Sequence, residues 1–168
     1  MIISCSNFLL RPWREGDEFS LAEHANNRKI WLNVRDRFPH PYSFDNAVQW
    51  IQKAKHSKTD FAIEYEGNAV GAIGLILKED VHRHSAEIGY WLGERYWNKK
   101  IMSEAVRAIT EYAFSNFDVC RVYAGLFEYN DASAKVLEKN GYTLEARLQK
   151  AISKEGTTYD ELMYAKIK

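Results

Sequence analysis

The stretch that most constrains the fold runs from residue 84 to residue 116, where a strand pattern passes directly into a helix pattern. Residues 84–92 alternate between apolar and other side chains, which is typical of a strand. The next segment keeps the spacing of one helical face, with apolar residues at Ile101, Ala105, Ala108, Ile109, Tyr112 and Ala113. The start of such a helix carries backbone N–H groups without intrahelical partners, at the positive end of the helix dipole. That end is suited to phosphate, although most strand-to-helix turns bind nothing.

Length and composition indicate a single globular domain. A chain of 168 residues is long enough for one core and short for two, so we expect residues 1–168 to form one domain. Hydrophobic residues make up 46% and aromatic residues 14%, which favours a packed core over disorder. Lys and Arg together number 23, as do Asp and Glu, so no net field attracts nucleic acid or an anionic membrane. We therefore expect no nucleic acid and no membrane among the partners.

The N-terminus and the cysteines predict a cytoplasmic protein. Residues 1–7 lack the basic start and the long apolar stretch of a signal peptide, and no apolar run is long enough to span a membrane. Cys5 and Cys120 lie far apart without the spacing of metal ligands, which favours buried, reduced thiols. The sequence leaves the oligomeric state, including a homodimer, open.

The remaining patterns predict a strand, two helices, three strands, a helix, a strand, a helix and two strands. The strands are expected at 8–13, 60–65, 69–77, 84–92, 120–127, 142–153 and 157–167, and the helices at 18–27, 43–55, 101–114 and 131–139. Asp17, Ser43 and Asn130 are the candidate N-caps. The 33–42 loop mixes charges, aromatic rings and two prolines, so it either contacts a ligand or is an ordinary surface connection. The hairpins make the sheet mixed and largely antiparallel.

One segment carries a family signature. Residues 130–142 (NDASAKVLEKNGY) match the pattern N-x-x-S-x-x-(V/I)-(L/M)-E-K-x-G-(F/Y), which resembles the GNAT superfamily of acyl-CoA-dependent N-acetyltransferases. The chain is most similar to the subgroup that includes the ribosomal-protein alanine N-acetyltransferases. Weaker matches follow in the family's order along nearly the whole chain: Leu10–Pro12 with Asp17, Trp50–Ile51, Phe61–Ile63 with Gly71–Gly74, Ala86–Leu92, and Ser103–Ala105. The resemblance implies an α/β (α+β) GNAT fold, with a mixed, largely antiparallel seven-stranded sheet and helices on both faces.

The chain departs from the family at the cofactor loop. The subgroup usually has W-G-K-G-Y-(A/M), whereas residues 97–102 read WNKKIM, so Asn98 and Lys100 replace both glycines. Glycines let backbone amides approach a pyrophosphate, sometimes at positive φ. In one interpretation Lys100 keeps an ordinary helical φ and its ammonium contacts the phosphates. In the other, a left-handed Lys100 costs roughly 1–2 kcal/mol, and cofactor use is altered or lost.

The resemblance implies acetyl-CoA as the acetyl donor and assigns its contacts. Backbone groups of Tyr90–Leu92 would contact the acetyl group and the pantetheine, and Asn130 would contact the pantetheine arm. The full set of cofactor-binding residues is Tyr90, Trp91, Leu92, Trp97, Asn98, Lys99, Lys100, Ile101, Met102, Ser103, Asn130 and Ser133.

The implied chemistry is attack of a neutral amine on a thioester, which needs a base, oxyanion stabilisation and an acid for the thiolate. Glu87 matches the family's base and shares a strand face with Trp91, where burial would strengthen it as a base. The alternative is a structural carboxylate bonded to a neighbouring strand or loop. Ser133 matches the serine that protonates the thiolate, or is a first-turn residue bonded to Asn130. Leu137 stands where other members have an acid tyrosine, so that route is absent.

Two functions of different classes follow. The first is an acetyl-CoA-dependent N-acetyltransferase acting on a primary amine, either a protein N-terminus or a small molecule. The second is an acyl-CoA-sensing or protein-binding module with little or no turnover, which Asn98 and Lys100 favour. His82 and His84 have the spacing of two zinc ligands on a strand, but no third ligand follows, so we expect no metal.

Overall fold

The computed structural model describes residues 1–168 and divides into two compact units. The first unit comprises residues 1–74 and 90–108, and the second comprises residues 75–89 and 109–168. Two strands and the longest helix therefore contribute residues to both units.

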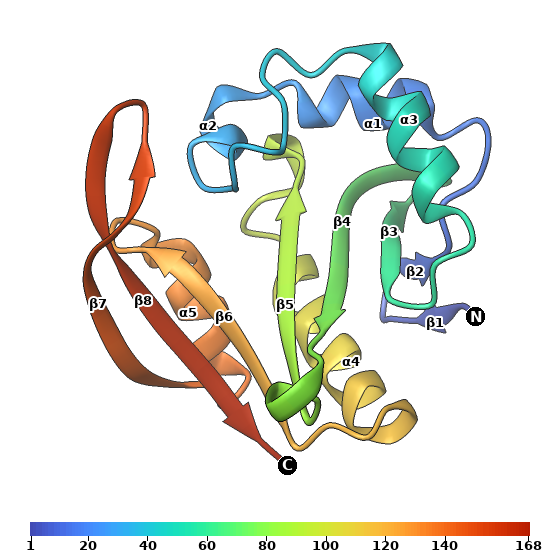
Figure 1. Cartoon of the computed structure of the whole chain (residues 1–168). Coiled ribbons are helices and arrows are strands. Elements are labelled where there is room, and N and C mark those ends of the chain that lie inside the picture. Colours follow the sequence, from blue (N-terminus) through green and yellow to red (C-terminus); the bar gives the residue numbers. More distant parts are fainter. The chain divides into compact units, whose positions relative to one another are not determined.

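Eight strands are hydrogen-bonded in the order β1-β2-β3-β4-β5-β6-β8-β7 (Figure 1). They are β1 (Ile3–Ser4), β2 (Leu9–Arg11), β3 (Asp60–Tyr65), β4 (Asn68–Leu77), β5 (Ser85–Leu92), β6 (Arg121–Phe127), β7 (Thr143–Lys154) and β8 (Thr157–Ile167). The β5–β6 pair is parallel. The pairs β1–β2, β2–β3, β3–β4, β6–β8 and β7–β8 are antiparallel, which confirms the mixed, largely antiparallel sheet. The sequence predicted seven strands, and the eighth, which it did not predict, is β1. This strand has two residues, too few for an alternating pattern to appear in the sequence.

Five α-helices accompany the sheet: α1 (Glu18–Ala25), α2 (Arg28–Trp31), α3 (Phe44–Ala54), α4 (Ile101–Asn116) and α5 (Asp131–Lys139). Short 3₁₀ turns, η1 (Asp80–His82) and η2 (Glu94–Tyr96), flank β5. The sequence did not predict α2, because four residues are too few for a helical period. Ser43 caps α3 as expected, in a capping box with Asn46.

The core of the first unit lies between α1, α3 and the β3–β4 hairpin. A cluster of buried residues joins these elements: Trp13, Leu21, Ala25, Tyr42, Ala47, Ile51, Ala54, Ala62 and Ala69. Ala62 belongs to this cluster, whereas its neighbours Phe61 and Ile63 point to the opposite face of β3 and are also buried. Both faces of β3 are therefore covered.

Asp17 corrects one expectation from the sequence. It occupies the N-cap position of α1, but its side chain makes no capping hydrogen bond. It instead accepts hydrogen bonds from both terminal nitrogens of the Arg11 guanidinium, at 2.7 and 2.8 Å. The Arg11 Nε donates to Glu64. The Arg11 and Asp17 side chains are only 4% and 5% exposed, and a buried guanidinium needs carboxylate partners more than a helix end needs a cap. Burial alone would lower the pKa of Arg11, but the bonds to Asp17 and Glu64 raise it.

In the second unit, α5 covers one face of the β6–β8–β7 sheet. Tyr164 on β8 donates its hydroxyl hydrogen to Glu138 on α5 at 3.0 Å, and Lys166 donates to the Asn140 carbonyl at 2.8 Å. The β6 residues on this face, Val122, Ala124 and Leu126, are buried. Figure 1 shows α5 beside β6 and β8. Gly141 follows α5 with a φ of 79°, a left-handed conformation that glycine adopts without strain at the end of a helix.

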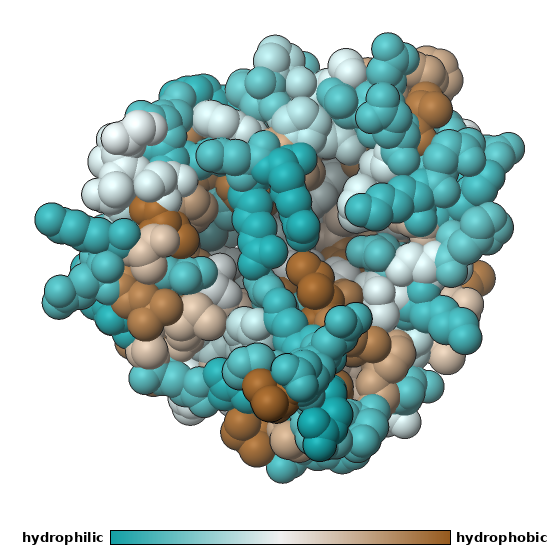
Figure 2. All heavy atoms as spheres, viewed as in Figure 1, coloured by the Kyte–Doolittle hydropathy of each residue, from teal (hydrophilic) through white to brown (hydrophobic).

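The surface is mixed in polarity. Figure 2 shows mostly hydrophilic side chains with separate hydrophobic patches. Neither cysteine forms a disulfide. Cys5 is half-buried, and its pKa is raised to about 11, mainly because burial disfavours the thiolate. Cys120 is exposed, so the expected burial was wrong for this thiol. None of the helices combines the length and the apolar character that crossing a membrane requires.

Candidate active site

The loop before α4 adopts the backbone conformation that glycines favour, although it contains none. Asn98 has a φ of 62° and Lys100 a φ of 65°, both in the left-handed region. The interpretation that Lys100 keeps an ordinary helical φ was therefore wrong. The strain costs roughly 1–2 kcal/mol at Lys100 and less at Asn98, since Asn tolerates this region. Strain of this kind persists where the surrounding structure imposes it, as at ligand-binding sites.

Lys100 forms the boundary of the 16-residue helix α4. Its carbonyl oxygen accepts the hydrogen bond of the Glu104 N–H at 3.1 Å, the first bond of the helix. The N–H groups of residues 101–103 precede that bond and point out of the helix start. The Lys100 side chain is exposed. The neighbouring Lys99 ammonium instead lies 5.2 Å from the Tyr96 ring centre, a cation–π contact.

A hydrogen bond from Trp97 connects the loop of residues 97–100 to the end of β5. The Trp97 Nε1–H donates to the Leu92 carbonyl at 2.7 Å, and the Gly93 N–H donates to the Val70 carbonyl at 2.8 Å. At the same end of β5, a Cβ on Gly71 of β4 would lie 2.6 Å from the Trp91 carbonyl oxygen, so only glycine permits this approach. The loop position thus follows from the strand to which it is bonded.

The side chain of Trp91 contacts the loop at residues 33–42. The rings of Phe38 and Trp91 meet edge to face, with centres 5.8 Å apart. Both rings pack against the core cluster of the first unit. The 33–42 loop therefore contacts Trp91, one of the predicted cofactor-binding residues. A loop that contacts the ligand would have to lie in such a position.

Glu87 has a partner that the sequence hypothesis lacked. The Lys78 ammonium lies 2.8 Å from the Glu87 carboxylate, which is 12% exposed. The hydrogen bond to Glu87 is the main reason that the pKa of Lys78 is raised. Glu87 also lies opposite Tyr123 in the parallel β5–β6 ladder, which ends at this pair. The carboxylate is thus bonded to the residue that follows β4, as the structural alternative expected, and remains on the predicted face of β5.

Asn130 and Ser133 meet at the start of α5. The Asn130 side-chain oxygen accepts a hydrogen bond from the Ser133 backbone N–H at 3.2 Å, so the capping expected from the sequence is confirmed. Ser133 is half-buried, and its hydroxyl keeps the proposed acid role as a hypothesis. Leu137, one turn further along α5, is fully buried.

Replacing Asn130 by alanine tests both roles of this residue. Loss of the cap should lower the free energy of unfolding by about 1 kcal/mol, and loss of a cofactor hydrogen bond should weaken acetyl-CoA binding by a similar free energy. Thermal melting and calorimetric titration separate the two effects. A melting point that falls while acetyl-CoA affinity is unchanged would leave Asn130 as a cap alone.

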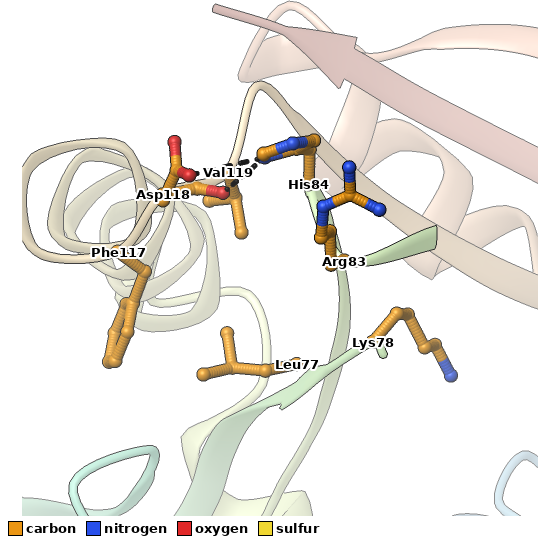
Figure 3. A pocket seen from close by; sticks show the side chains of 7 residues that line it. All are labelled: Leu77, Lys78, Arg83, His84, Phe117, Asp118 and Val119. Atoms are coloured by element: carbon orange, nitrogen blue, oxygen red, sulfur yellow. Dashed lines mark hydrogen bonds and ion pairs between the residues drawn. The ribbon is translucent and has the colours of Figure 1, made fainter. Parts of the chain in front are cut away.

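A surface pocket of about 240 Å³ in the second unit does not contain the predicted residues. Leu77, Lys78, Arg83, His84, Phe117, Asp118 and Val119 line it (Figure 3). The His84 ring Nδ1 lies 3.0 Å from the Asp118 carbonyl oxygen, so this imidazole bonds to the rim. In Figure 3 the charged ends of Lys78 and Arg83 extend away from Phe117. No group of three or more His, Cys, Asp or Glu side chains is arranged to hold a metal ion.

The predicted residues divide between the two units. Tyr90–Leu92 and Trp97–Ser103 belong to the first unit and are joined by the Trp97 bond. Glu87, Asn130 and Ser133 belong to the second.

The fold agrees with comparisons to known proteins. Residues 7–143 match the model of the acetyltransferase (GNAT) domain, so the chain belongs to the GNAT acetyltransferase family. It is 37% identical to the uncharacterized N-acetyltransferase YnaD of Bacillus subtilis, over 98% of this chain and 96% of that protein. It is 33% identical to the uncharacterized N-acetyltransferase YoaA of the same organism, over 59% of this chain and 55% of YoaA, so that match spans about half of the relative. Among solved structures, the ribosomal L7/L12 α-N-protein acetyltransferase RimL in complex with coenzyme A shares the fold, with a TM-score of 0.86, 24% identity and coverage of 99% and 98%.

Proposed function

We propose that this protein is an acetyl-CoA-dependent N-acetyltransferase that acts on a primary amine. The observation that carries the proposal is the left-handed backbone at Asn98 and Lys100. Backbone strain persists where the surrounding structure imposes it and is often found at ligand-binding sites, which supports a retained cofactor loop. Membership of the family and the RimL–coenzyme A complex support the same cofactor.

The residues at the start of α4 fit the diphosphate of the cofactor. The N–H groups of residues 101–103 and the positive end of the α4 dipole suit an anion. The exposed Lys100 ammonium adds a positive charge beside them. Along β5, residues after Glu87 lie beyond the β6 ladder, so backbone groups of Tyr90–Leu92 suit the acetyl and pantetheine contacts. Asn130 would contact the pantetheine arm.

The reaction forms a bond between the amine nitrogen and the acetyl carbon and breaks the bond between that carbon and sulfur. Glu87 takes the proton that the amine must lose, through its carboxylate on the face of β5. Lys78, at 2.8 Å, holds this carboxylate in place. The Ser133 hydroxyl supplies a proton to the leaving thiolate.

The acceptor is either a protein N-terminus or a small-molecule amine, and the 33–42 segment, which contacts Trp91 through Phe38, would line its pocket. We further propose that residues 1–168 act as a single domain in the cytoplasm. The absence of net charge supports an acceptor other than nucleic acid.

Calorimetric titration with acetyl-CoA, followed by a thiol-release assay over a panel of amines, tests this function. We expect saturable acetyl-CoA binding and thiol release that requires an amine. Binding without thiol release for any amine would favour the acyl-CoA-sensing module. No binding would overturn both.

Lys100 variants test the cofactor loop. Lys100→Glu should weaken acetyl-CoA binding at least tenfold, because it replaces attraction to the phosphates by repulsion, with a smaller loss at high salt. Lys100→Gly should change affinity much less, since glycine adopts the observed φ without strain. The same variant should raise the free energy of unfolding by roughly 1 kcal/mol.

The opposing view is that Lys100 blocks the phosphates. On that view the wild-type protein binds poorly and Lys100→Gly gains more than tenfold in affinity. Titration of the three proteins distinguishes the two views, and the exposed residue Lys139 gives a matched charge-reversal control, Lys139→Glu.

A further inference from the structure

The second unit has a sheet face that α5 does not cover. Alternate residues of β6 point to this face: Arg121, Tyr123, Gly125 and Phe127. The face of β6 that α5 covers is buried, whereas Gly125 is exposed and the other three residues of the uncovered face are half-buried. Glu87 of β5 belongs to the uncovered face, because it lies opposite Tyr123 in the ladder. The face therefore begins at the proposed catalytic base.

A second carboxylate lies on the same face. A Cβ built on Gly125 would lie 2.2 Å from Oε1 and 3.0 Å from Cδ of Glu161, which is on β8. The Glu161 carboxylate thus occupies the space that any other residue at position 125 would fill with its own side chain. The negative group therefore lies directly against the β6 backbone at Gly125.

Aromatic rings adjoin this carboxylate. Phe127 is the cross-strand partner of Glu161, and Tyr159 lies two residues earlier on the same face of β8. Tyr129 stacks on Phe127 with ring centres 5.2 Å apart and meets Tyr159 edge to face at 5.0 Å. Carboxylates and aromatic faces both attract ammonium groups. The Glu161 carboxylate and the adjoining rings together have the composition of a site for an organic cation.

The spacing to Glu87 follows from sheet geometry. Glu87 lies one strand from β6 at the level of Tyr123, and the Glu161 carboxylate lies against β6 at the level of Gly125. Strands about 4.8 Å apart and a rise of about 3.3 Å per residue place the two carboxylates roughly 8 Å apart. An extended diamine of about six carbons spans such a distance.

We propose that Glu161, with the Phe127–Tyr129–Tyr159 rings, binds a second cationic group of the acceptor while Glu87 serves the reacting amine. This inference rests on the proposed function and names its substrate class: primary amines that carry another positive charge roughly 8 Å away. Such acceptors are polyamines, or peptides whose N-terminal residue is followed by a basic side chain. Glu161 is then a specificity-determining residue that contacts the part of the acceptor that does not react.

Matched probes test the proposal. Hexylamine and hexane-1,6-diamine have the same carbon chain and differ in the second ammonium; the dipeptide amides Ala-Leu and Ala-Lys differ in the same way. We expect kcat/KM for hexane-1,6-diamine to exceed that for hexylamine at least tenfold. The peptide pair identifies the source of the cation, because a basic peptide acceptor requires the same preference for Ala-Lys and a polyamine acceptor does not.

Variants assign the preference to Glu161. Glu161→Gln should raise KM for the diamine about tenfold and leave KM for hexylamine and the melting point nearly unchanged. Gly125→Ala should act in the same direction by displacing the carboxylate. The control is Glu111→Gln, which removes an equal charge from the exposed surface of α4 and should not change the ratio of the two kcat/KM values.

The outcomes separate this inference from the proposed function. If both amines are acetylated equally well, or if Glu161→Gln retains the preference, the cation site is wrong while the transferase stands. If acetyl-CoA binds and no amine is acetylated, the proposed function itself fails and the cation site falls with it.

Discussion

Replacing Glu87 by glutamine should lower kcat by a factor of roughly 10²–10⁴ and leave acetyl-CoA affinity nearly unchanged. The amide has nearly the same shape as the carboxylate but cannot take a proton from the amine. Glu87 is 12% exposed and lies on the face of β5 that also carries Trp91. Steady-state kinetics over about pH 6–9 and calorimetric titration measure the two quantities.

Lys78→Met is the matched control for this variant. It removes the ion pair with Glu87 and leaves the carboxylate on β5. If Glu87 is the base, Lys78→Met should lose far less activity than Glu87→Gln. If the carboxylate is only the structural partner of Lys78, the two variants should behave alike. Wild-type turnover in Glu87→Gln at every pH would assign the proton transfer to another group.

Replacing Asp17 by alanine should lower the free energy of unfolding by about 3–5 kcal/mol, the largest stability effect that we expect in this chain. Asp17 accepts two hydrogen bonds from Arg11, whose side chain is only 4% exposed. The substitution leaves a buried guanidinium with Glu64 as its remaining carboxylate partner. Urea denaturation monitored by fluorescence gives the free energy.

Glu23→Ala is the control for Asp17→Ala. Glu23 also lies on α1 and pairs with Arg95, but both of these side chains are largely exposed. Surface pairs contribute little, so this change should cost less than about 1 kcal/mol. A loss of similar size in the two variants would show that burial of the Arg11–Asp17 pair does not set its contribution.

The sequence predicted the elements whose signals are local. The β7–β8 hairpin follows from Glu155-Gly156, both at positive φ, between two strand patterns. The α5 boundaries follow from Asn130 at one end and Gly141 at the other. The sequence also predicted the buried face of α4, since Ile101, Ala105 and Ile109 are all buried as their spacing indicated.

Long-range partners were beyond what the sequence could predict. Nothing in the local pattern around Asp17 shows that Arg11 competes for its carboxylate. The sequence therefore predicted the N-cap position of Asp17 but not the partner of its side chain. Lys78 meets Glu87 only because β4 and β5 lie side by side, and Glu161 reaches Gly125 only because β6 and β8 pair. The φ of Lys100 ran against the residue's own preference, as happens where surrounding structure outweighs local propensity.

Transfer of an isotope-labelled acetyl group from acetyl-CoA to an amine, followed by mass spectrometry, tests the central claim most directly. Incubation of the protein with labelled acetyl-CoA and hexane-1,6-diamine should give the labelled N-acetyl product and one free coenzyme A per product formed. Glu87→Gln at the same concentration should give at most a few per cent of that product. Release of coenzyme A without label on the amine nitrogen, or equal product with and without the protein, would contradict the assignment as an N-acetyltransferase.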